Sequence, residues 1–260
     1  MQLSERQQAI LEQVQARGFA TIEVLAEAFG VSAQTIRRDI IRLDRARLLQ
    51  RFHGGAGLLR EAPVRLGYVQ KTALAGDAKQ TIARLAADLA PEGAVVYLDV
   101  GTTSEAVARR LAKRSGLFVV TNSVRIAGLF AGRSDLQVVV TGGSLRGADG
   151  SLVGAEANAA VRQFRFDLAF VGCSGLDAEA GVTDFDPDKV AVKRSAIESA
   201  AAAVLLADAS KVGRAAVVRI APLTAFGRLV TDRPLPDPLR QACTAAGCTV
   251  VAPALEAAAG

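Results

Sequence analysis

Short apolar runs alternate with stretches of helical periodicity from residue 79 onward, and this alternation constrains the fold more than any other feature. The apolar runs are Ala94–Leu98, Leu117–Val120, Leu136–Val140, Leu168–Val171, Val204–Ala207, Leu229–Val230 and Thr249–Val251. The helical stretches are Lys79–Leu89, Glu105–Lys113, Val124–Phe130, Ala155–Phe164, Lys189–Ala200 and Pro238–Ala246. Buried strands that alternate with helices are typical of a parallel sheet covered on both faces. The sequence therefore predicts an α/β fold, with a Rossmann-like parallel-sheet domain over residues 77–260.

Residues 1–57 have a different pattern, which is typical of a winged helix-turn-helix. Ser4, Thr21 and Ser32 each precede an apolar stripe at helical spacing, as N-cap residues do. Gly30 lies between the second and third predicted helices, so these two helices are expected to meet at a tight turn. A short hairpin, the wing, is expected to follow the third helix. The chain is thus predicted to begin with a DNA-binding domain.

The excess positive charge of the chain lies in the same region. Residues 32–60 contain seven arginines and two acidic residues, and this net charge of +5 equals that of the whole chain. A local basic stripe on an otherwise balanced chain is typical of nucleic-acid binding, and a solvated helix face is the alternative. The residues expected to contact DNA lie in the third helix, at its cap and in the wing: Ser32, Gln34, Thr35, Arg37, Arg38, Arg42, Arg51 and His53.

Small polar residues follow five of the apolar runs, where the predicted strands end. Ligands of open α/β sheets bind beyond the carboxyl ends of the strands, and a helix N-terminus at that edge favours an anion. Residues 101–104 form the best phosphate cradle, whereas no dinucleotide or Walker fingerprint is present, so no cofactor is expected. The predicted ligand-binding residues are Asp99, Gly101, Thr102, Thr103, Ser104, Thr121, Asn122, Gly142, Gly143, Lys193, Asp208 and Lys211. For the two lysines, a surface salt bridge is the alternative to a phosphate contact.

Three other features limit the classes of function. The chain has one histidine and three cysteines, so neither a His-based metal site nor a disulfide framework is expected. Cys173 is interpreted as a buried residue at a strand end rather than a nucleophile. No apolar run reaches the roughly 18–20 residues of a membrane span, and the N-terminus lacks a signal-peptide pattern, so a cytoplasmic location is expected.

The N-terminal motifs resemble those of the DeoR family of bacterial repressors. The matching elements are Arg6, the segment Ser32–Ile40 with its S-x-x-T-I-R-R-D-I pattern, and the HGGA at residues 53–56. Within this signature, Asp39 is expected to be structural and to orient Arg42 or a neighbouring arginine. The mixed segment 58–76 is interpreted as the linker to the second domain.

The second domain is similar to the sensor domain of the same family. The matching elements are the D-x-G-T-T loop, Thr121–Ser123, Gly142–Gly143, Phe166–Asp167, Gly181–Thr183, Lys193–Arg194 and the D-x-S-K element at residues 208–211. The resemblance implies a fold like that of sugar-phosphate isomerases and a cleft that senses a phosphorylated metabolite. Within the family, the pattern is most similar to members that regulate glycerol 3-phosphate metabolism, so glycerol 3-phosphate is the first candidate effector.

The resemblance implies a transcriptional repressor, not an enzyme, with double-stranded operator DNA as its macromolecular partner. Because one winged helix buries little surface, a homodimer or homotetramer is expected. Two alternatives remain at this point. One is a sugar-phosphate isomerase-like enzyme fused to a DNA-binding module, for which Asp99, Glu156, Asp208 and Lys193 have suitable side chains. The other is a regulator of the same family that senses a different sugar phosphate.

Overall fold

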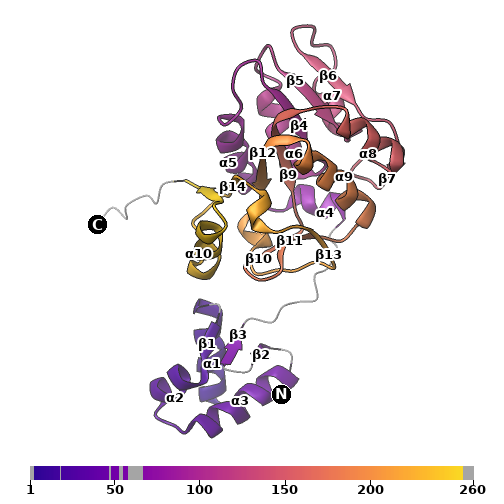
Figure 1. Cartoon of the computed structure of the whole chain (residues 1–260). Coiled ribbons are helices and arrows are strands. Elements are labelled where there is room, and N and C mark those ends of the chain that lie inside the picture. Colours follow the sequence, from indigo (N-terminus) through magenta and orange to yellow (C-terminus); the bar gives the residue numbers. More distant parts are fainter. Residues whose placement is uncertain (1–2, 18, 47, 53–54, 58–66, 254–260) are drawn as a thin grey trace. The chain divides into compact units, whose positions relative to one another are not determined.

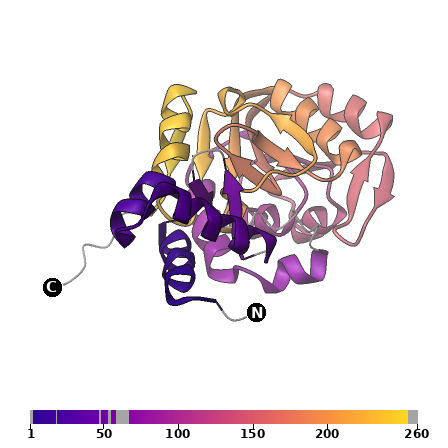
Figure 2. The same ribbon diagram turned by 90° about the horizontal axis from the view of Figure 1, so that it is seen from below.

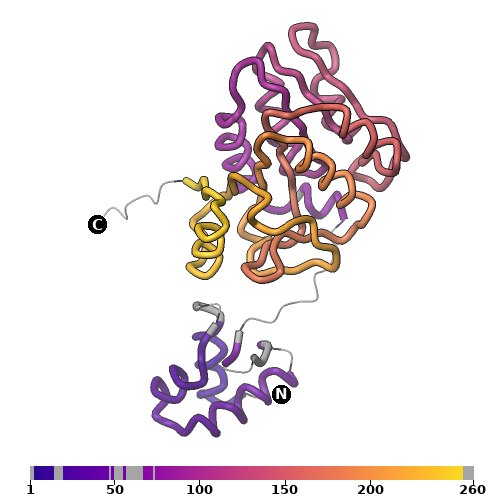
Figure 3. Tube along the Cα trace, viewed as in Figure 1, coloured from indigo at the N-terminus to yellow at the C-terminus, as the bar shows by residue number. Residues whose placement is uncertain are grey.

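A computed structural model describes residues 3–17, 19–46, 48–52, 55–57 and 67–253 (Figure 3). The chain divides into two compact units, residues 1–64 and residues 65–260. The second unit begins earlier than the sequence predicts. Residues 68–73 form helix α4 and residue 76 begins helix α5, so the C-terminal part of the expected linker belongs to the second unit.

The first unit contains three helices and a small antiparallel sheet with strand order β1-β3-β2. Its elements are α1 (Glu5–Arg17), β1 (Phe19–Thr21), α2 (Ile22–Phe29), α3 (Ala33–Arg45), β2 (Gln50–Phe52) and β3 (Gly55–Gly57). The Thr21 and Ser32 hydroxyls cap α2 and α3, each accepting a backbone N–H at 3.2 Å. Ile10, Leu25 and Ile36 form part of a fully buried core between the helices. The predicted winged helix-turn-helix is therefore confirmed.

A seven-stranded parallel sheet forms the centre of the second unit, with strand order β15-β14-β12-β9-β4-β5-β6 (Figure 1). Its strands are β4 (Val95–Leu98), β5 (Phe118–Thr121), β6 (Gln137–Val140), β9 (Phe166–Gly172), β12 (Ala200–Leu206), β14 (Arg228–Val230) and β15 (Thr249–Val251). Each strand overlaps one of the seven apolar runs. Central strands such as β4 and β5 are buried on both faces and are therefore apolar nearly throughout. The predicted sheet is confirmed.

Helices cover both faces of this sheet, as Figures 1 and 2 show together. Alternate strand residues point to opposite faces. Val96 and Leu98 pack with α5, α6 and α7, whereas Tyr97 packs with α8, α9 and α10. The bounds of these helices are α5 (Gly76–Ala87), α6 (Thr102–Leu111), α7 (Val124–Leu129), α8 (Ala155–Arg162), α9 (Pro187–Glu198) and α10 (Asp237–Ala245).

Short elements outside the main sheet were not predicted from the sequence. They are α4 (Tyr68–Ala73), the hairpin of β7 (Ser144–Arg146) and β8 (Ser151–Val153), the antiparallel sheet of β10 (Gly175–Asp177), β11 (Gly181–Asp184) and β13 (Val218–Ala221), and the 3-10 turns η1 (Ala209–Lys211) and η2 (Leu223–Ala225). None of the described helices has the length and apolar character needed to cross a bilayer.

Candidate functional site

A pocket of about 260 Å³ lies at the carboxyl ends of β12, β9 and β4, which are neighbours in the sheet. From β4 the chain first continues to β5 and β6 on one side, and later to β9 and β12 on the other. Open α/β sheets bind ligands at such a reversal of strand order. The loops after these three strands line the pocket with residues 101–104, residues 172–174, and Asp208, Ser210 and Lys211.

The N-terminus of α6 forms one wall of the pocket. Its N-cap, Gly101, has φ +122°, a conformation that favours glycine, and it contributes no capping side chain. The first turn of a helix leaves its N–H groups without helical partners, here those of Thr102, Thr103 and Ser104. The Ser104 hydroxyl is also buried without a hydrogen-bond partner among the described residues. These donors make the wall suited to an anion, as the sequence predicts.

Lysine side chains gather at this pocket. The chain has only six lysines, against 25 arginines, and five of the six line the pocket. These five are Lys71, Lys79, Lys189, Lys193 and Lys211. Only Lys193 and Lys211 were predicted as ligand-binding residues. The scarcity of lysine in an arginine-rich chain is the sequence signal that points to the other three.

The ammonium group of Lys193 is already paired within a buried ionic cluster. Its Nζ donates to an Asp99 carboxylate oxygen and, at 3.0 Å, to the Gly172 carbonyl oxygen, and it lies 3.6 Å from Asp184 Oδ2. Burial alone lowers the pKa of Lys193, but the carboxylates of Asp99 and Asp184 outweigh burial and raise it. Two carboxylates therefore already neutralise its charge. Lys193 does line the pocket, and its predicted phosphate contact stays a prediction. Asp99 itself is fully buried and does not line the pocket.

The D-x-S-K element forms the turn η1 at the end of β12. Asp208 Oδ1 caps this turn by accepting the Ser210 N–H at 2.9 Å. Lys211 Nζ lies 3.8 Å from Asp208 Oδ2 and 3.2 Å from the Ser210 hydroxyl oxygen. The Lys211 ammonium is therefore only loosely paired, and its position in the lining lets it reach a bound anion.

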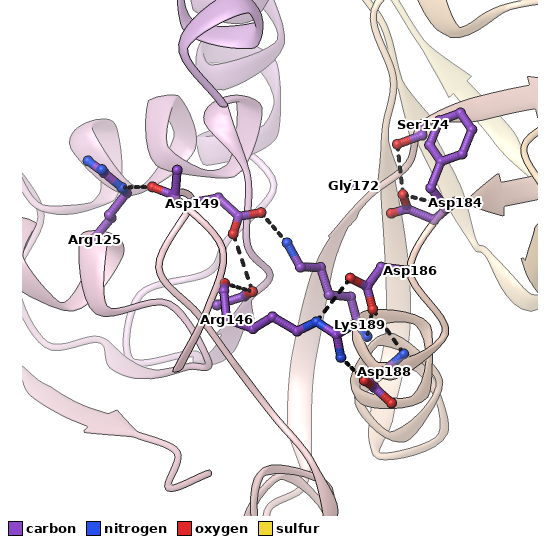
Figure 4. Close-up of polar contacts among 12 residues, drawn as sticks. Arg125, Arg146, Asp149, Gly172, Ser174, Asp184, Asp186, Asp188 and Lys189 are labelled. Atoms are coloured by element: carbon purple, nitrogen blue, oxygen red, sulfur yellow. Dashed lines mark hydrogen bonds and ion pairs between the residues drawn. The ribbon is translucent and has the colours of Figure 1, made fainter. Parts of the chain in front are cut away.

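Further lining comes from the turn of the β7–β8 hairpin, from the end of β11 and from the start of α9, whose polar contacts Figure 4 shows. Lys189 Nζ donates to Asp149 Oδ2, and Arg146 Nε lies 3.5 Å from Asp186 Oδ2. The Ser174 hydroxyl donates to Asp184 Oδ1 at 2.7 Å. Burial acts to raise the pKa of Asp184, but the charge of Lys193 and the bonds from Ser174 and a backbone N–H hold it below its ordinary value. This part of the lining offers carboxylate acceptors, which suit the hydroxyl groups of a ligand.

Besides Asp99, four predicted ligand-binding residues do not line the pocket: Thr121, Asn122, Gly142 and Gly143. They follow β5 and β6, which lie on the far side of β4 from β9. The Thr121 hydroxyl donates to the Leu98 carbonyl, and Asn122 bonds both the Tyr97 hydroxyl and the Leu152 carbonyl. A Cβ at Gly143 would lie 2.6 Å from the Val153 carbonyl oxygen. Asn122 and Gly143 thus contact the β7–β8 hairpin, and Thr121 joins β5 to β4. The predicted ligand contacts of these four residues stay predictions.

Of the side chains suited to acid–base chemistry, Asp208 and Lys193 line the pocket, whereas Asp99 and Glu156 do not. Burial raises the pKa of the Cys173 thiol to about 12, so the thiol stays protonated and is a poor nucleophile. The expectation of a buried Cys173 is wrong, because this residue is half-buried and lines the pocket. Glu156 is exposed on α8 and does not line the pocket. No group of acidic, histidine or cysteine side chains within the described part of the chain has the arrangement of a metal site.

The recognition helix α3 presents a basic face. Gln34, Arg37, Arg38 and Arg42 are exposed, whereas Ile36, Ile40 and Leu43 on the other face are buried. Of the cap residues, Ser32 is exposed and Thr35 is half-buried, with their hydroxyl oxygens 3.0 Å apart. The backbone of Arg51 pairs with Ala56 across the wing, and His53 lies outside the described residues.

Asp39 is structural, but its partners differ from those expected. Its carboxylate accepts hydrogen bonds from Arg6 Nε at 2.7 Å and from Gln7 Nε2 at 2.9 Å. Both partners lie on α1, so Asp39 joins α3 to α1 instead of orienting Arg42 on its own helix. The error arose because the spacing along α3 does not show which face of that helix meets α1.

Comparison with known proteins identifies both units. The DeoR-like helix-turn-helix domain matches residues 6–62, and the DeoR C terminal sensor domain matches residues 75–233. Solved structures with a partial likeness include ribose 5-phosphate isomerase A from Methanocaldococcus jannaschii, with a TM-score of 0.38 and 20% identity, covering 52% of this chain and 54% of that one.

Similar whole-length relatives are transcriptional regulators. The glycerol-3-phosphate regulon repressor of Escherichia coli (strain K12) is 36% identical over 244 residues, which cover 94% of this chain and 96% of that protein. The HTH-type transcriptional regulator GlpR of Haloferax volcanii is 37% identical over 248 residues, covering 95% and 97%. The chain therefore belongs to the DeoR family of helix-turn-helix transcriptional regulators.

Proposed function

We propose that this chain represses genes for the use of glycerol or glycerol 3-phosphate, and that glycerol 3-phosphate releases it from its operator. The names of its relatives support the regulon. The observation that supports the effector class is the N-terminus of α6 at a pocket whose lining includes Lys71 and the loosely paired Lys211. Helix N–H groups and ammonium groups together favour a phosphate, and the acidic wall at Asp149 and Asp186 suits hydroxyl groups.

We favour sensing over isomerisation because proton transfer needs a free acid or base beside the substrate. Asp99 and Lys193 are bonded to each other, and Cys173 is protonated. We also propose that the repressor acts in the cytoplasm as a homodimer or homotetramer, since a single winged helix buries less surface than tight operator binding requires.

Fluorescence anisotropy with an operator selected from random DNA tests this function. Glycerol 3-phosphate, fructose 1-phosphate and deoxyribose 5-phosphate are titrated separately into the labelled complex. The proposal predicts release at the lowest concentration for glycerol 3-phosphate. Release by one of the other two instead would transfer the effector role to that sugar phosphate. Turnover of any of these compounds by the purified protein would contradict a purely sensing role.

A further inference from the structure

Helix α4 is held at both of its ends by contacts with neighbouring helices. Near its start, the Tyr68 hydroxyl donates to Glu105 Oε2 on α6 at 3.0 Å, and the Arg125 guanidinium lies 4.1 Å from the centre of the Tyr68 ring. At its C-terminal end, the ammonium of Lys79 on α5 donates to the carbonyl oxygens of Lys71 and Leu74. A lysine that bonds the last carbonyls of a helix fixes that end. Helix α4 is therefore a docked element of the second unit.

Lys71 extends from α4 into the pocket lining. Unlike Lys193, it has no ion pair with a carboxylate among the described residues. Burial lowers the pKa of Lys71, Asp184 acts against this, and the charges of Lys211, Lys193 and Lys189 lower it further. Lys189 and Lys193 are paired with carboxylates, whereas Lys211 is only loosely paired. An anion bound between Lys71 and Lys211 offsets the repulsion of these two ammonium groups and attracts Lys71 toward it.

We propose that Lys71 binds the anionic group of the effector, so that an occupied pocket holds α4 more firmly against α6 than an empty one does. This inference rests on the proposed function, because it assigns a further residue to the same site. Residues 65–260 form the second unit, so α4 lies within ten residues of the boundary with the DNA-binding unit. Tighter docking of α4 restrains the chain where it leaves the sensor unit. Ligand binding in the pocket can in this way affect the segment that connects to the DNA-binding unit.

Calorimetric titration with inorganic phosphate and with glycerol 3-phosphate tests the contact. Lys71→Gln is expected to weaken the binding of both compounds by about ten- to a hundredfold, because a hydrogen bond to a charged group is lost. Lys71→Arg keeps the charge and is expected to retain most of the affinity. Lys113→Gln is the matched control, since Lys113 is exposed and is the one lysine that does not line the pocket. Unaltered phosphate and glycerol 3-phosphate affinity in Lys71→Gln would overturn the inference.

Hydrogen exchange of residues 67–76 tests the effect on α4. Saturating glycerol 3-phosphate is expected to slow amide exchange of residues 67–76 in the wild type. In Lys71→Gln, a higher concentration that saturates the variant is expected to leave this exchange unchanged. Equal slowing in both proteins would contradict the role of Lys71. If glycerol 3-phosphate binds no better than phosphate but both depend on Lys71, the proposed effector fails and the inference stands. If the wild type binds neither compound, the inference fails as well.

Discussion

At the scale of single residues, the pocket separates side chains that meet a ligand from those that hold the site together. Thr102 begins α6 and lines the pocket, whereas the charge of Lys193, also in the lining, is paired with the fully buried Asp99. Thr102 and Asp99 follow the same strand, β4, and both have polar or charged side chains. Burial and pairing, which no spacing in the sequence specifies, decide which role each residue has.

Replacing Thr102 with valine keeps the shape of the side chain and removes its hydroxyl. We expect the affinity for glycerol 3-phosphate to fall about ten- to a hundredfold, because a phosphate oxygen loses a hydrogen bond. Operator binding without effector should be unchanged, so the variant in a cell is a repressor that resists induction. Thr244→Val is a suitable control, since Thr244 is exposed on α10. Equal effector sensitivity of Thr102→Val and the control would remove this hydroxyl from the site.

We expect Asp184 to contribute to the loss of stability in acid. Its pKa is lower in the folded chain than its ordinary value of about 3.9, so the folded state binds fewer protons than the unfolded state. The resulting stabilisation is complete above the ordinary value and is lost as the pH falls through the lower folded value. Thermal unfolding between pH 6 and pH 3 should show a smaller loss of stability in Asp184→Asn than in the wild type. Parallel pH profiles for the two proteins would exclude this contribution.

At the scale of elements, α3 and the wing are expected to divide the work of binding DNA. Arg37 lies early in α3 and is exposed, the usual place for contacts to base edges. Arg37→Ala should cost about 1–3 kcal/mol on the operator and relax specificity at one position. Arg51→Ala should weaken binding to all sequences similarly and reduce the salt slope by about one. Anisotropy titrations on operator and random DNA at several salt concentrations measure both effects. An unchanged operator-to-random ratio in Arg37→Ala would contradict the recognition role of α3.

The strands and the recognition helix could be predicted because their sequence patterns are strong and local. Apolar runs marked every strand of the parallel sheet, and N-caps such as Ser32 marked the helix starts. The pocket was only partly predictable. The loops after β5 and β6 have polar residues of the same kinds as the loop after β4. The local spacing of residues does not specify the order of the strands in the sheet, so these loops could not be told apart. The walls formed by α4 and the β7–β8 hairpin were missed because elements this short give weak periodic signals.

At the scale of the whole molecule, two separately folded units carry two binding sites, one for DNA and one for a phosphorylated effector. Release by an effector requires that the two ligands favour different states of the protein. Thermodynamic linkage then requires the coupling to be reciprocal, so that the operator weakens effector binding by the same factor as the effector weakens operator binding. Such factors are typically about 5- to 150-fold.

Calorimetric titration of glycerol 3-phosphate into the protein, alone and saturated with operator, tests this coupling most directly. We predict that the Kd for glycerol 3-phosphate is higher in the operator complex than in the free protein. Saturating glycerol 3-phosphate should raise the Kd for operator by the same factor. If glycerol 3-phosphate binds with the same Kd in the presence and absence of operator, the two sites are independent, and the protein is not a repressor released by this effector.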